Sequence, residues 1–209
     1  MIYIHHKMAV CHIPEMITDR NHNLCVLLDK SFYSIDDAAQ LYKELVANVT
    51  YDKNSVVKIF GKSIPIPRKQ TAYGDPGTTY TFSNVTVNAK PWIPIILKIK
   101  ADVEYILGLQ FNFCLVNKYD TGENYIGYHK DDEIDLGQNP AIASVSFGQE
   151  RKFYFKSDDP NVPVTKLKLS SGTLCVMYDP TNKNYKHSVP KEVKVTGCRI
   201  NLTFRHIQI

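Results

Sequence analysis

The heptad Arg199-Ile200-Asn201-Leu202-Thr203-Phe204-Arg205 alternates strictly between polar and apolar residues. Residues i and i+2 of a strand point to the same side, so the heptad predicts a strand with one polar and one apolar face. Six residue steps separate the Cα atoms of its arginines by about 20 Å at roughly 3.3 Å per residue. Because each arginine reaches about 6 Å, a gap of about 8 Å remains, the size of a small dicarboxylate held by a guanidinium at each end. The alternative is a pair of exposed arginines on an edge strand.

A His-X-Asp pattern, His129 and Asp131, stands upstream of this heptad. On extended backbone the two side chains point the same way and can reach one metal ion. Such tripeptides are also common in solvated turns, so the pattern alone is weak evidence. His187, twelve residues before Arg199, is a possible third ligand. Two histidines and one carboxylate leave half of an octahedral iron open, as in non-haem Fe(II) oxygenases.

The composition predicts one globular domain that spans residues 1–209. The chain is 44% hydrophobic, which is enough for one sizeable core, and its net charge of +4 fits a polyanionic partner without requiring one. Its five cysteines are scattered and lack metal-site spacing, which indicates reduced thiols of an intracellular protein. No apolar run approaches the roughly 18 residues of a membrane span, so no membrane association is expected.

Two helices are expected in the first half of the chain. Ser34 or Asp36 could cap the first helix. Its core-facing residues are expected to be Ile35, Ala38, Leu41, Tyr42, Leu45, Val46 and Val49. A second helix is expected to open at 90–94, with proline in its first turn, to run to about Tyr105 and to be closed by Gly108. Its expected buried residues are Ile95, Ile96, Ile99, Val103 and Ile106. Trp92 is interpreted as core or domain-edge packing rather than as a platform for a base.

Short strands are expected to predominate from Phe111 onward. The expected strands are 111–117, 141–147, 151–155, 166–169, 173–178 and 199–205, and 24–28 is a candidate first strand. Glycines and prolines separate these segments at near-regular intervals. Many short strands with regularly spaced turns predict a sandwich or jelly roll.

The segment between the two helices contains an aromatic residue directly before a glycine, Phe60-Gly61. This could be the turn of a hairpin with its aromatic ring folded inward. The alternative is an apolar wedge that opens a base stack, as in proteins that bend DNA or extrude bases. Arg68 and Lys69 just beyond would then lie on phosphates.

Taken together, these motifs resemble the AlkB family of Fe(II)/2-oxoglutarate-dependent nucleic-acid dealkylases. The resemblance rests on Asn117-X-Tyr119, on the His-X-Asp pattern that begins twelve residues after Asn117, on His187, and on the two arginines of the heptad. Four further motifs look like the nucleotide-recognition lid of AlkB homologues that repair double-stranded DNA. They are Phe60-Gly61-Lys62, Pro67-Arg68-Lys69-Gln70, Tyr73-Gly74-Asp75 and Tyr80-Thr81-Phe82-Ser83. The similarity runs from about residue 60 to 207.

The resemblance implies a mainly β fold with flanking helices (α+β). Its double-stranded β-helix (jelly roll) core would span about 109–207, with an N-terminal nucleotide-recognition lid at about 50–90. It also implies catalytic Fe(II) held by His129, Asp131 and His187, with 2-oxoglutarate and O2 as co-substrates. Neutral imidazole is required for the metal, so activity should fall in acid. Arg199 would pair with the far carboxylate of 2-oxoglutarate and Arg205 with the near one. Hydrogen bonds to the co-substrate would come from Asn117, Tyr119, Asn201 and Thr203.

The activity implied is direct repair of N1-methyladenine and N3-methylcytosine, preferentially in double-stranded DNA. Hydroxylation of the N-methyl carbon on a flipped base would release formaldehyde, succinate and CO2. The expected substrate-binding residues are Ile59, Phe60, Gly61, Lys62, Arg68, Tyr80, Phe82, Ser83, Asp132 and Glu133, with Phe60 as the finger that fills the hole left by the base. The carboxylates of Asp132 and Glu133 would favour the cationic methylated base, and methylation also lowers the cost of flipping.

Three other functions stay open. The same chemistry could act on RNA or single-stranded DNA, although a Phe60 wedge is useful only where a stack has to be opened. A protein hydroxylase is disfavoured by the basic lid residues Lys62, Arg68 and Lys69. A non-catalytic module that binds damaged DNA would have lost a metal ligand, and all three are present. A monomer is expected, located wherever the DNA is, which means the nucleus in a eukaryote.

Overall fold

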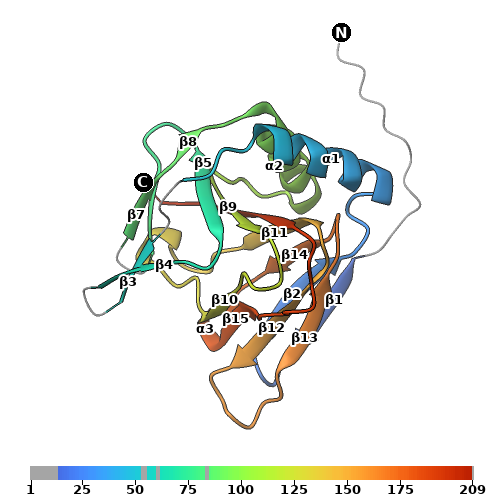
Figure 1. Ribbon diagram of the computed structural model, residues 1–209. Helices are drawn as coiled ribbons and strands as arrows, with labels where there is room; N and C mark the ends of the chain where they lie inside the picture. The colour runs from blue at the N-terminus through green and yellow to red at the C-terminus, as the bar shows by residue number, and fades with distance from the viewer. Residues whose placement is uncertain (1–13, 53–55, 60–61, 83–84, 209) are drawn as a thin grey trace.

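Two facing β-sheets form the centre of the computed structural model, which describes residues 14–52, 56–59, 62–82 and 85–208 (Figure 1). The larger sheet has the order β1-β2-β14-β11-β16-β9-β5-β8, and the smaller has the order β10-β15-β12-β13. The strands of the larger sheet are β1 (Glu15–Asp19), β2 (Leu24–Asp29), β5 (Lys69–Gly74), β8 (Lys90–Pro91), β9 (Phe113–Tyr119), β11 (Ile142–Gly148), β14 (Leu174–Met177) and β16 (Arg199–Arg205). Those of the smaller sheet are β10 (Ile126–His129), β12 (Arg151–Ser157), β13 (Thr165–Leu169) and β15 (Tyr185–Val189). This arrangement confirms the predicted jelly roll.

Two helices cover the outer face of the larger sheet. They are α1 (Ile35–Asn48) and α2 (Pro94–Leu107), and their apolar sides share one core with β9, β11, β14 and β16. Ser34, not Asp36, caps α1, because its side chain accepts a hydrogen bond from the backbone N–H of Asp37. Gly108 ends α2 in the left-handed conformation, as expected. Two short helical turns complete the chain, η1 (Ile134–Leu136) and α3 (Thr181–Asn184).

Some details of the helix predictions were wrong. Ile35, Val46 and Ile106 are exposed rather than part of the core. Residues 90–91 form the short strand β8 beside β5, so the second helix begins only at Pro94. Trp92 packs at the edge of the helix-side core and donates a hydrogen bond from Nε1 to Asp75 Oδ1 (2.6 Å), which fits the interpretation as domain-edge packing.

A second core fills the space between the two sheets. Strand β16 contributes to both layers. Its apolar residues Ile200, Leu202 and Phe204 pack under the helices, and its polar residues face the smaller sheet. The opposite side of the inter-sheet space is apolar, with Phe153 and Phe155 of β12 buried there. The polar patch on β16 therefore lies inside the jelly roll, not on an edge strand.

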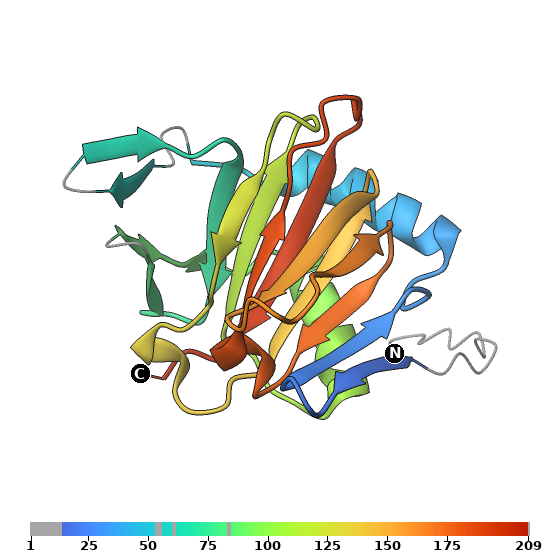
Figure 2. The same cartoon turned by 90° about the horizontal axis from the view of Figure 1, so that it is seen from below.

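Two hairpins project from one end of the sandwich, at the left of Figures 1 and 2. They pair β3 (Val56–Ile59) with β4 (Lys62–Pro65), and β6 (Thr79–Phe82) with β7 (Val85–Asn88). The predicted lid range, 50–90, contains both hairpins, but it also contains β5 and β8 of the larger sheet. Three lid predictions, Phe60, Gly61 and Ser83, lie outside the described residues, and so do the side chains of Ile59, Lys62 and Phe82.

The cysteines in the described part of the chain, Cys25, Cys114, Cys175 and Cys198, are free thiols. Across the same residues, no helix combines the length and the apolar character needed to cross a membrane.

Candidate active site

His129, Asp131 and His187 converge at the inner side of the smaller sheet. His129 ends β10 and stands directly opposite His187 on β15, so strand pairing sets the two imidazoles side by side, with ring centroids 4.2 Å apart. Asp131 Oδ1 lies 3.7 Å from His129 Nε2 and 4.0 Å from His187 Nε2. Two donors at about 2.1 Å from one ion can be no more than about 4.2 Å apart, so each of these pairs fits a single metal ion. Among the described residues this trio is the His/Cys/Asp/Glu cluster suited to a metal.

Hydrogen bonds outside the trio orient its members. The Nδ1 of His129 donates to the carbonyl of Gly127 (3.0 Å), which leaves Nε2 without a proton and free to bind a metal. Asn182 braces the backbone of Asp131: its Oδ1 accepts from the Asp131 N–H (3.2 Å), and its Nδ2 donates to the Asp131 carbonyl. Arg205 Nη2 donates to Asp131 Oδ2 (2.5 Å) and leaves Oδ1 facing the two imidazoles.

Burial and charge set the protonation of the trio. Burial lowers the pKa of His187 to about 3, helped by the neighbouring His129, and burial likewise lowers the pKa of His129. Burial alone would raise the pKa of Asp131, but the charge of Arg205 and the two imidazoles outweigh it and hold that pKa below its usual range. At neutral pH the site therefore offers two neutral imidazoles and one carboxylate, which is the protonation that a divalent metal requires.

The polar face of β16 continues the site away from the trio. Register places Asn201 opposite Asn117 and Arg199 opposite Tyr119, so the four predicted residues meet across two neighbouring strands. Arg199 Nη2 donates to Asn201 Oδ1 (2.5 Å) and also to Ser146 Oγ (3.0 Å). Asn201 Nδ2 donates in turn to Thr203 Oγ1 (2.8 Å). The result is a fixed polar wall on the larger sheet.

Both arginines of this wall keep buried N–H groups without a partner. Within the described residues, Nε and Nη1 of Arg199 and the same two atoms of Arg205 make no hydrogen bond, although the two side chains are 1% and 4% exposed. A buried, unpaired N–H of a charged group is costly unless an acceptor is supplied. Two such groups about one strand length apart fit a ligand with a carboxylate at each end, and this observation supports 2-oxoglutarate.

Metal site and polar wall open into one cavity of about 430 Å³. The wall nearest the second core adds Leu115, Phe153, Cys175, Met177 and Val189, and the partly exposed Tyr125 and Tyr128 also line the cavity. Glu133 lines it as well and accepts a hydrogen bond from the hydroxyl of the buried Tyr80. Burial raises the pKa of Glu133 above its usual value. The Glu133 carboxylate could therefore interact with a cation bound in the cavity.

Several predicted substrate residues take unexpected positions. Arg68 was expected on phosphates, but it lines the cavity and donates from Nε to Asn117 Oδ1 (2.8 Å). Tyr80 was expected among the substrate-binding residues, either stacked on the base or packed in the core, and its ring packs against Phe113 (centroids 5.3 Å apart) and under the guanidinium of Arg205 (5.1 Å). Asp132 is exposed and does not belong to the cavity lining, unlike its neighbour Glu133.

Other residues of the site were not predicted from the sequence. Ser144 and Ser146 of β11 both contact Asn201, and their alternation in Ala143-Ser144-Val145-Ser146 was the available signal. Asn182, which braces Asp131, carried no local signal, because its partner is 51 residues away.

Comparisons with known proteins agree with this geometry. The model of the 2OG-Fe(II) oxygenase superfamily matches residues 25–205. The human DNA oxidative demethylase ALKBH2 is 44% identical over 180 residues, and the match covers 82% of this chain and 69% of the relative. Bovine ALKBH2 is 42% identical over the same share of this chain and 65% of its own length, so the chain spans about two thirds of these relatives. The bovine alpha-ketoglutarate-dependent dioxygenase alkB homolog 3 is 32% identical over 191 residues, 87% of this chain and 66% of the relative.

A solved structure of OsALKBH1 shares the fold. Its TM-score is 0.64 at 19% identity, and the superposition covers 92% of this chain and all of the other. The matching family model, the cluster of two histidines and one aspartate, and the buried arginines with free N–H groups lead to one conclusion: this chain belongs to the 2OG-Fe(II) oxygenase superfamily and uses Fe(II) and 2-oxoglutarate.

Proposed function

We propose that this chain is a DNA oxidative demethylase that removes the methyl group from N1-methyladenine and N3-methylcytosine, preferentially in double-stranded DNA. The observation that carries the proposal is the single cavity in which the metal trio, the polar wall and the half-buried Glu133 meet. The similarity to proteins named as DNA oxidative demethylases, human and bovine ALKBH2, supports DNA as the substrate.

In this proposal the metal and co-substrate are held by the two sheets together. Nε2 of His129, Oδ1 of Asp131 and Nε2 of His187 would bind Fe(II). Arg199 would bind the far carboxylate of 2-oxoglutarate. Arg205 would serve both the near carboxylate and Asp131, whose free oxygen it already turns toward the imidazoles. Further hydrogen bonds to the co-substrate would come from Asn117, Tyr119, Asn201 and Thr203.

Bound iron and 2-oxoglutarate supply, with O2, the oxidising power that hydroxylates the N-methyl carbon while 2-oxoglutarate becomes succinate and CO2. The protein's part is to orient the base and to exclude water from the cavity. The hydroxymethyl group then leaves as formaldehyde, and the normal base is restored. The apolar side of the cavity, with Phe153 and Met177, suits the exclusion of water.

Glu133 would select the substrate by charge. Methylation at N1 of adenine or N3 of cytosine makes the base cationic, and a carboxylate in the cavity wall attracts the cation more strongly than the neutral base. The hydroxyl of Tyr80 fixes this carboxylate through their hydrogen bond. Tyr80 therefore acts by positioning Glu133 rather than by stacking on the base.

The region 50–90 would act as the lid. Residues 64–67 of β4 and its continuation line the cavity, so the hairpin β3–β4 borders the opening, and Phe60 lies in the sequence that joins its two strands. Phe60, with Ile59, Gly61 and Lys62 beside it, would fill the hole left by the flipped base. Phe82 and Ser83 would contact the same nucleotide. The protein would act as one domain and as a monomer, in the nucleus if its organism has one.

The test is a demethylation assay on matched oligonucleotides. Protein reconstituted anaerobically with Fe(II) is given 2-oxoglutarate, air and a duplex that carries one N1-methyladenine or N3-methylcytosine, or the same single strand, and the intact mass is measured. We expect the duplex to lose the mass of one CH2 unit, and no loss with His187→Ala. Phe60→Ala should reduce turnover mainly on the duplex. Repair of the single strand alone would favour the RNA or single-strand function, and a peptide hydroxylase would leave both oligonucleotides unchanged.

A further inference from the structure

The outer face of the smaller sheet is lined with lysine and tyrosine. On β12 the side chains of Phe153 and Phe155 turn inward against His187, so the alternate residues turn outward. Together with their neighbours on β13 and β15 they form a surface that we call the lysine face. Its members are Lys152, Tyr154, Lys156, Lys166, Lys168 and Lys186. Every outward position of β12 and β13 is Lys or Tyr.

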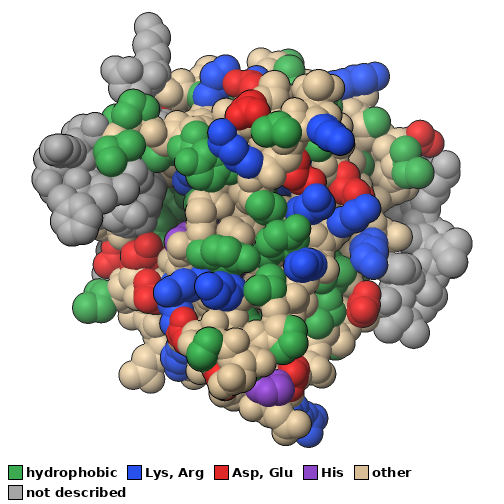
Figure 3. Space-filling view, turned by 60° about the horizontal axis from the view of Figure 1, so that its bottom comes forward, with side chains coloured by type: hydrophobic (Ala, Val, Ile, Leu, Met, Phe, Trp, Pro, Cys, Tyr) green, Lys and Arg blue, Asp and Glu red, His purple; other side chains and the backbone are tan. Residues whose placement is uncertain are grey.

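Strand register sets these lysines against one another. Lys152 pairs with Lys168 across β12 and β13, and Lys156 pairs with Lys186 across β12 and β15. Like charges at directly opposite positions destabilise a sheet, so the fold itself gains nothing from this pattern. Figure 3, with the lower part of the molecule brought forward, shows groups of blue side chains across this side.

Few carboxylates of the protein neutralise the lysine face. Glu150 lies 3.7 Å from Lys168, and Glu192 lies 3.4 Å from Lys152. Within the described part of the chain, Lys156, Lys166 and Lys186 have no carboxylate at ion-pair distance. Lys166 instead stands over the ring of its cross-strand neighbour Tyr154, with Nζ 5.8 Å from the ring centroid. The lysine face is therefore positively charged, and several of its ammonium groups are available to bind an anion.

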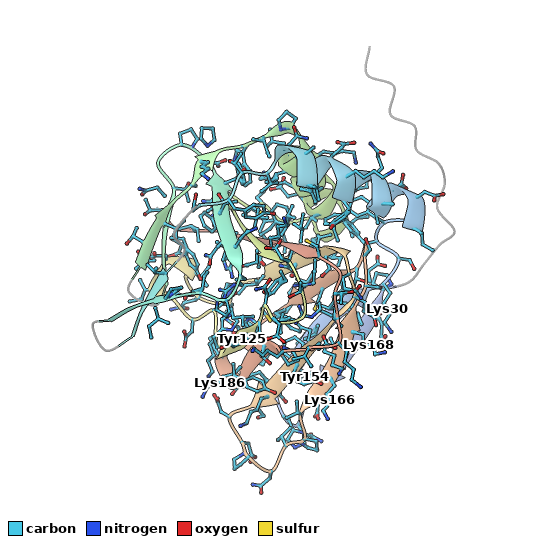
Figure 4. All side chains as sticks on the ribbon, viewed as in Figure 1. Lys30, Tyr125, Tyr154, Lys166, Lys168 and Lys186 are labelled. Carbon is cyan, nitrogen blue, oxygen red and sulfur yellow. The ribbon has the colours of Figure 1, made fainter. Side chains whose placement is uncertain are left out.

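The lysine face reaches the rim of the active-site cavity. Tyr128 lines the cavity and is 43% exposed, and Lys156 Nζ lies 5.8 Å from the centroid of its ring. From there the face extends over β15, β12 and β13, where Figure 4 labels Lys186, Tyr154, Lys166 and Lys168. Because neighbouring strands are about 4.8 Å apart, lysines on three strands spread over roughly 10 Å, wider than a single phosphate group needs.

We propose that the lysine face binds the sugar–phosphate backbone of the nucleic acid whose modified base enters the cavity. This inference rests on the proposed function as a DNA demethylase. Charge complementarity and continuity with the cavity rim together favour a nucleic acid over an acidic protein, since a strand whose base occupies the cavity must leave across an adjoining surface. Lysine ammonium groups on flexible stems suit contacts to phosphates that do not depend on sequence.

The test compares two double variants of equal charge in the full-length protein. Lys166→Gln/Lys186→Gln removes two members of the lysine face, and Lys43→Gln/Lys98→Gln removes two exposed lysines from the helices on the far side of the larger sheet. Affinity for an unmodified duplex is measured over a range of salt concentrations. The slope of log affinity against log salt should be about 2 units shallower for the lysine-face variant, at about 0.9 for each lost phosphate contact. If affinities converge near 1 M salt, the loss at 0.15 M is about thirtyfold. The control should match the wild type.

Turnover separates this inference from the proposed function. On a methylated trinucleotide, which is too short to leave the cavity and cross the face, the lysine-face variant should keep the wild-type kcat/KM, and on a long duplex it should lose activity at moderate salt. Equal salt slopes for the two double variants would overturn the inference, even if the enzyme demethylates DNA. The inference would also be overturned if the lysine-face variant lost binding to anionic vesicles or to polyglutamate but bound the duplex as tightly as the wild type. If the wild type demethylates nothing, the proposed function fails, but a shallower slope on unmodified duplex still supports a nucleic-acid surface here.

Discussion

Replacing Arg199 by methionine should weaken 2-oxoglutarate binding strongly while costing the metal-loaded protein little stability. The guanidinium is 1% exposed, and its Nε and Nη1 have no partner among the described residues, so a bound carboxylate would gain two charge-assisted hydrogen bonds. At about 1.5 kcal/mol each, the lower end for bonds to charged groups, their loss amounts to about 3 kcal/mol, or roughly a hundredfold in Kd. Without co-substrate, the lost bonds to Ser146 and Asn201 are offset by removing a buried charge with unpaired N–H groups.

Arg151 provides the matched control. It is also 1% exposed, but its guanidinium is fully engaged by Glu192 and by the backbone carbonyls of Thr121, Asn124 and Pro190. Arg151→Met should therefore lower the free energy of unfolding by several kcal/mol, because Glu192 and three backbone carbonyls lose their hydrogen-bond donor. The Kd for 2-oxoglutarate should stay unchanged.

The assay is thermal unfolding of Mn(II)-loaded protein, which does not turn over, with and without 2-oxoglutarate. At a concentration of 100 times the wild-type Kd, the co-substrate should stabilise the wild type by about 2.7 kcal/mol and Arg199→Met by about 0.4 kcal/mol. A co-substrate-binding role for Arg199 is refuted if Arg199→Met is destabilised as much as Arg151→Met and still gains the full stabilisation from 2-oxoglutarate.

Other predictions follow from the same site. His187→Ala should abolish Mn(II) binding seen by titration calorimetry, and a Kd within threefold of the wild type would show that His187 is not a ligand. Glu133→Gln should lower kcat/KM for cationic lesions about tenfold, through loss of roughly 1.4 kcal/mol of charge attraction, and spare a neutral methylated base; equal losses on both would refute selection by charge. The lowered pKa of His187, about 3, means that the unfolded chain takes up a proton below about 6.5 that the folded chain does not. Stability of the metal-free protein should therefore fall as pH decreases from about 6.5 toward 4, by about 1.4 kcal/mol per unit, and His187→Phe should flatten that slope. Asn182→Ala should weaken Mn(II) binding without changing the ligand set, because Asp131 loses its backbone brace; unchanged metal affinity would contradict that role.

The parts of the site that could be predicted from sequence are those set by local backbone geometry. Alternation in 199–205 gave both faces of β16 correctly, because a strand in the middle of a two-layered fold needs one face for each core. The helices followed from apolar spacing and from Ser34 and Gly108 at their ends. His129 and Asp131 were paired by their spacing, although only His129 lies within a strand.

The parts that could not be predicted depend on contacts between distant segments. Strands β10 and β15, which carry His129 and His187, were not predicted, because each is short and their pairing has an irregular register. From strand spacing alone, both Arg199 and Arg205 were expected to bind only a dicarboxylate. In the fold, Arg205 also contacts Asp131, which is 74 residues away in the sequence. Arg68 was expected to face DNA because it stands among basic residues, and it turns inward because Asn117 of β9 accepts its Nε–H.

The proposed lid combines the sequence motifs around Phe60 and Tyr80 with two hairpins. Strands β3, β4, β6 and β7 place two hairpins at the end of the sandwich where the cavity is lined by 64–67. Residue Phe60, the proposed finger, lies outside the described residues. Its role is tested by the duplex preference of Phe60→Ala.

The fate of the methyl carbon distinguishes DNA demethylation from other oxygenase chemistry. A duplex carrying one N1-methyladenine with a ¹³C-labelled methyl group is treated with the Fe(II) protein, 2-oxoglutarate and air, and labelled formaldehyde, succinate and repaired duplex are counted in the same reaction. DNA demethylation yields equal amounts of all three. Succinate without labelled formaldehyde, from a duplex that keeps its methyl group, would leave the oxygenase chemistry intact and contradict DNA demethylation.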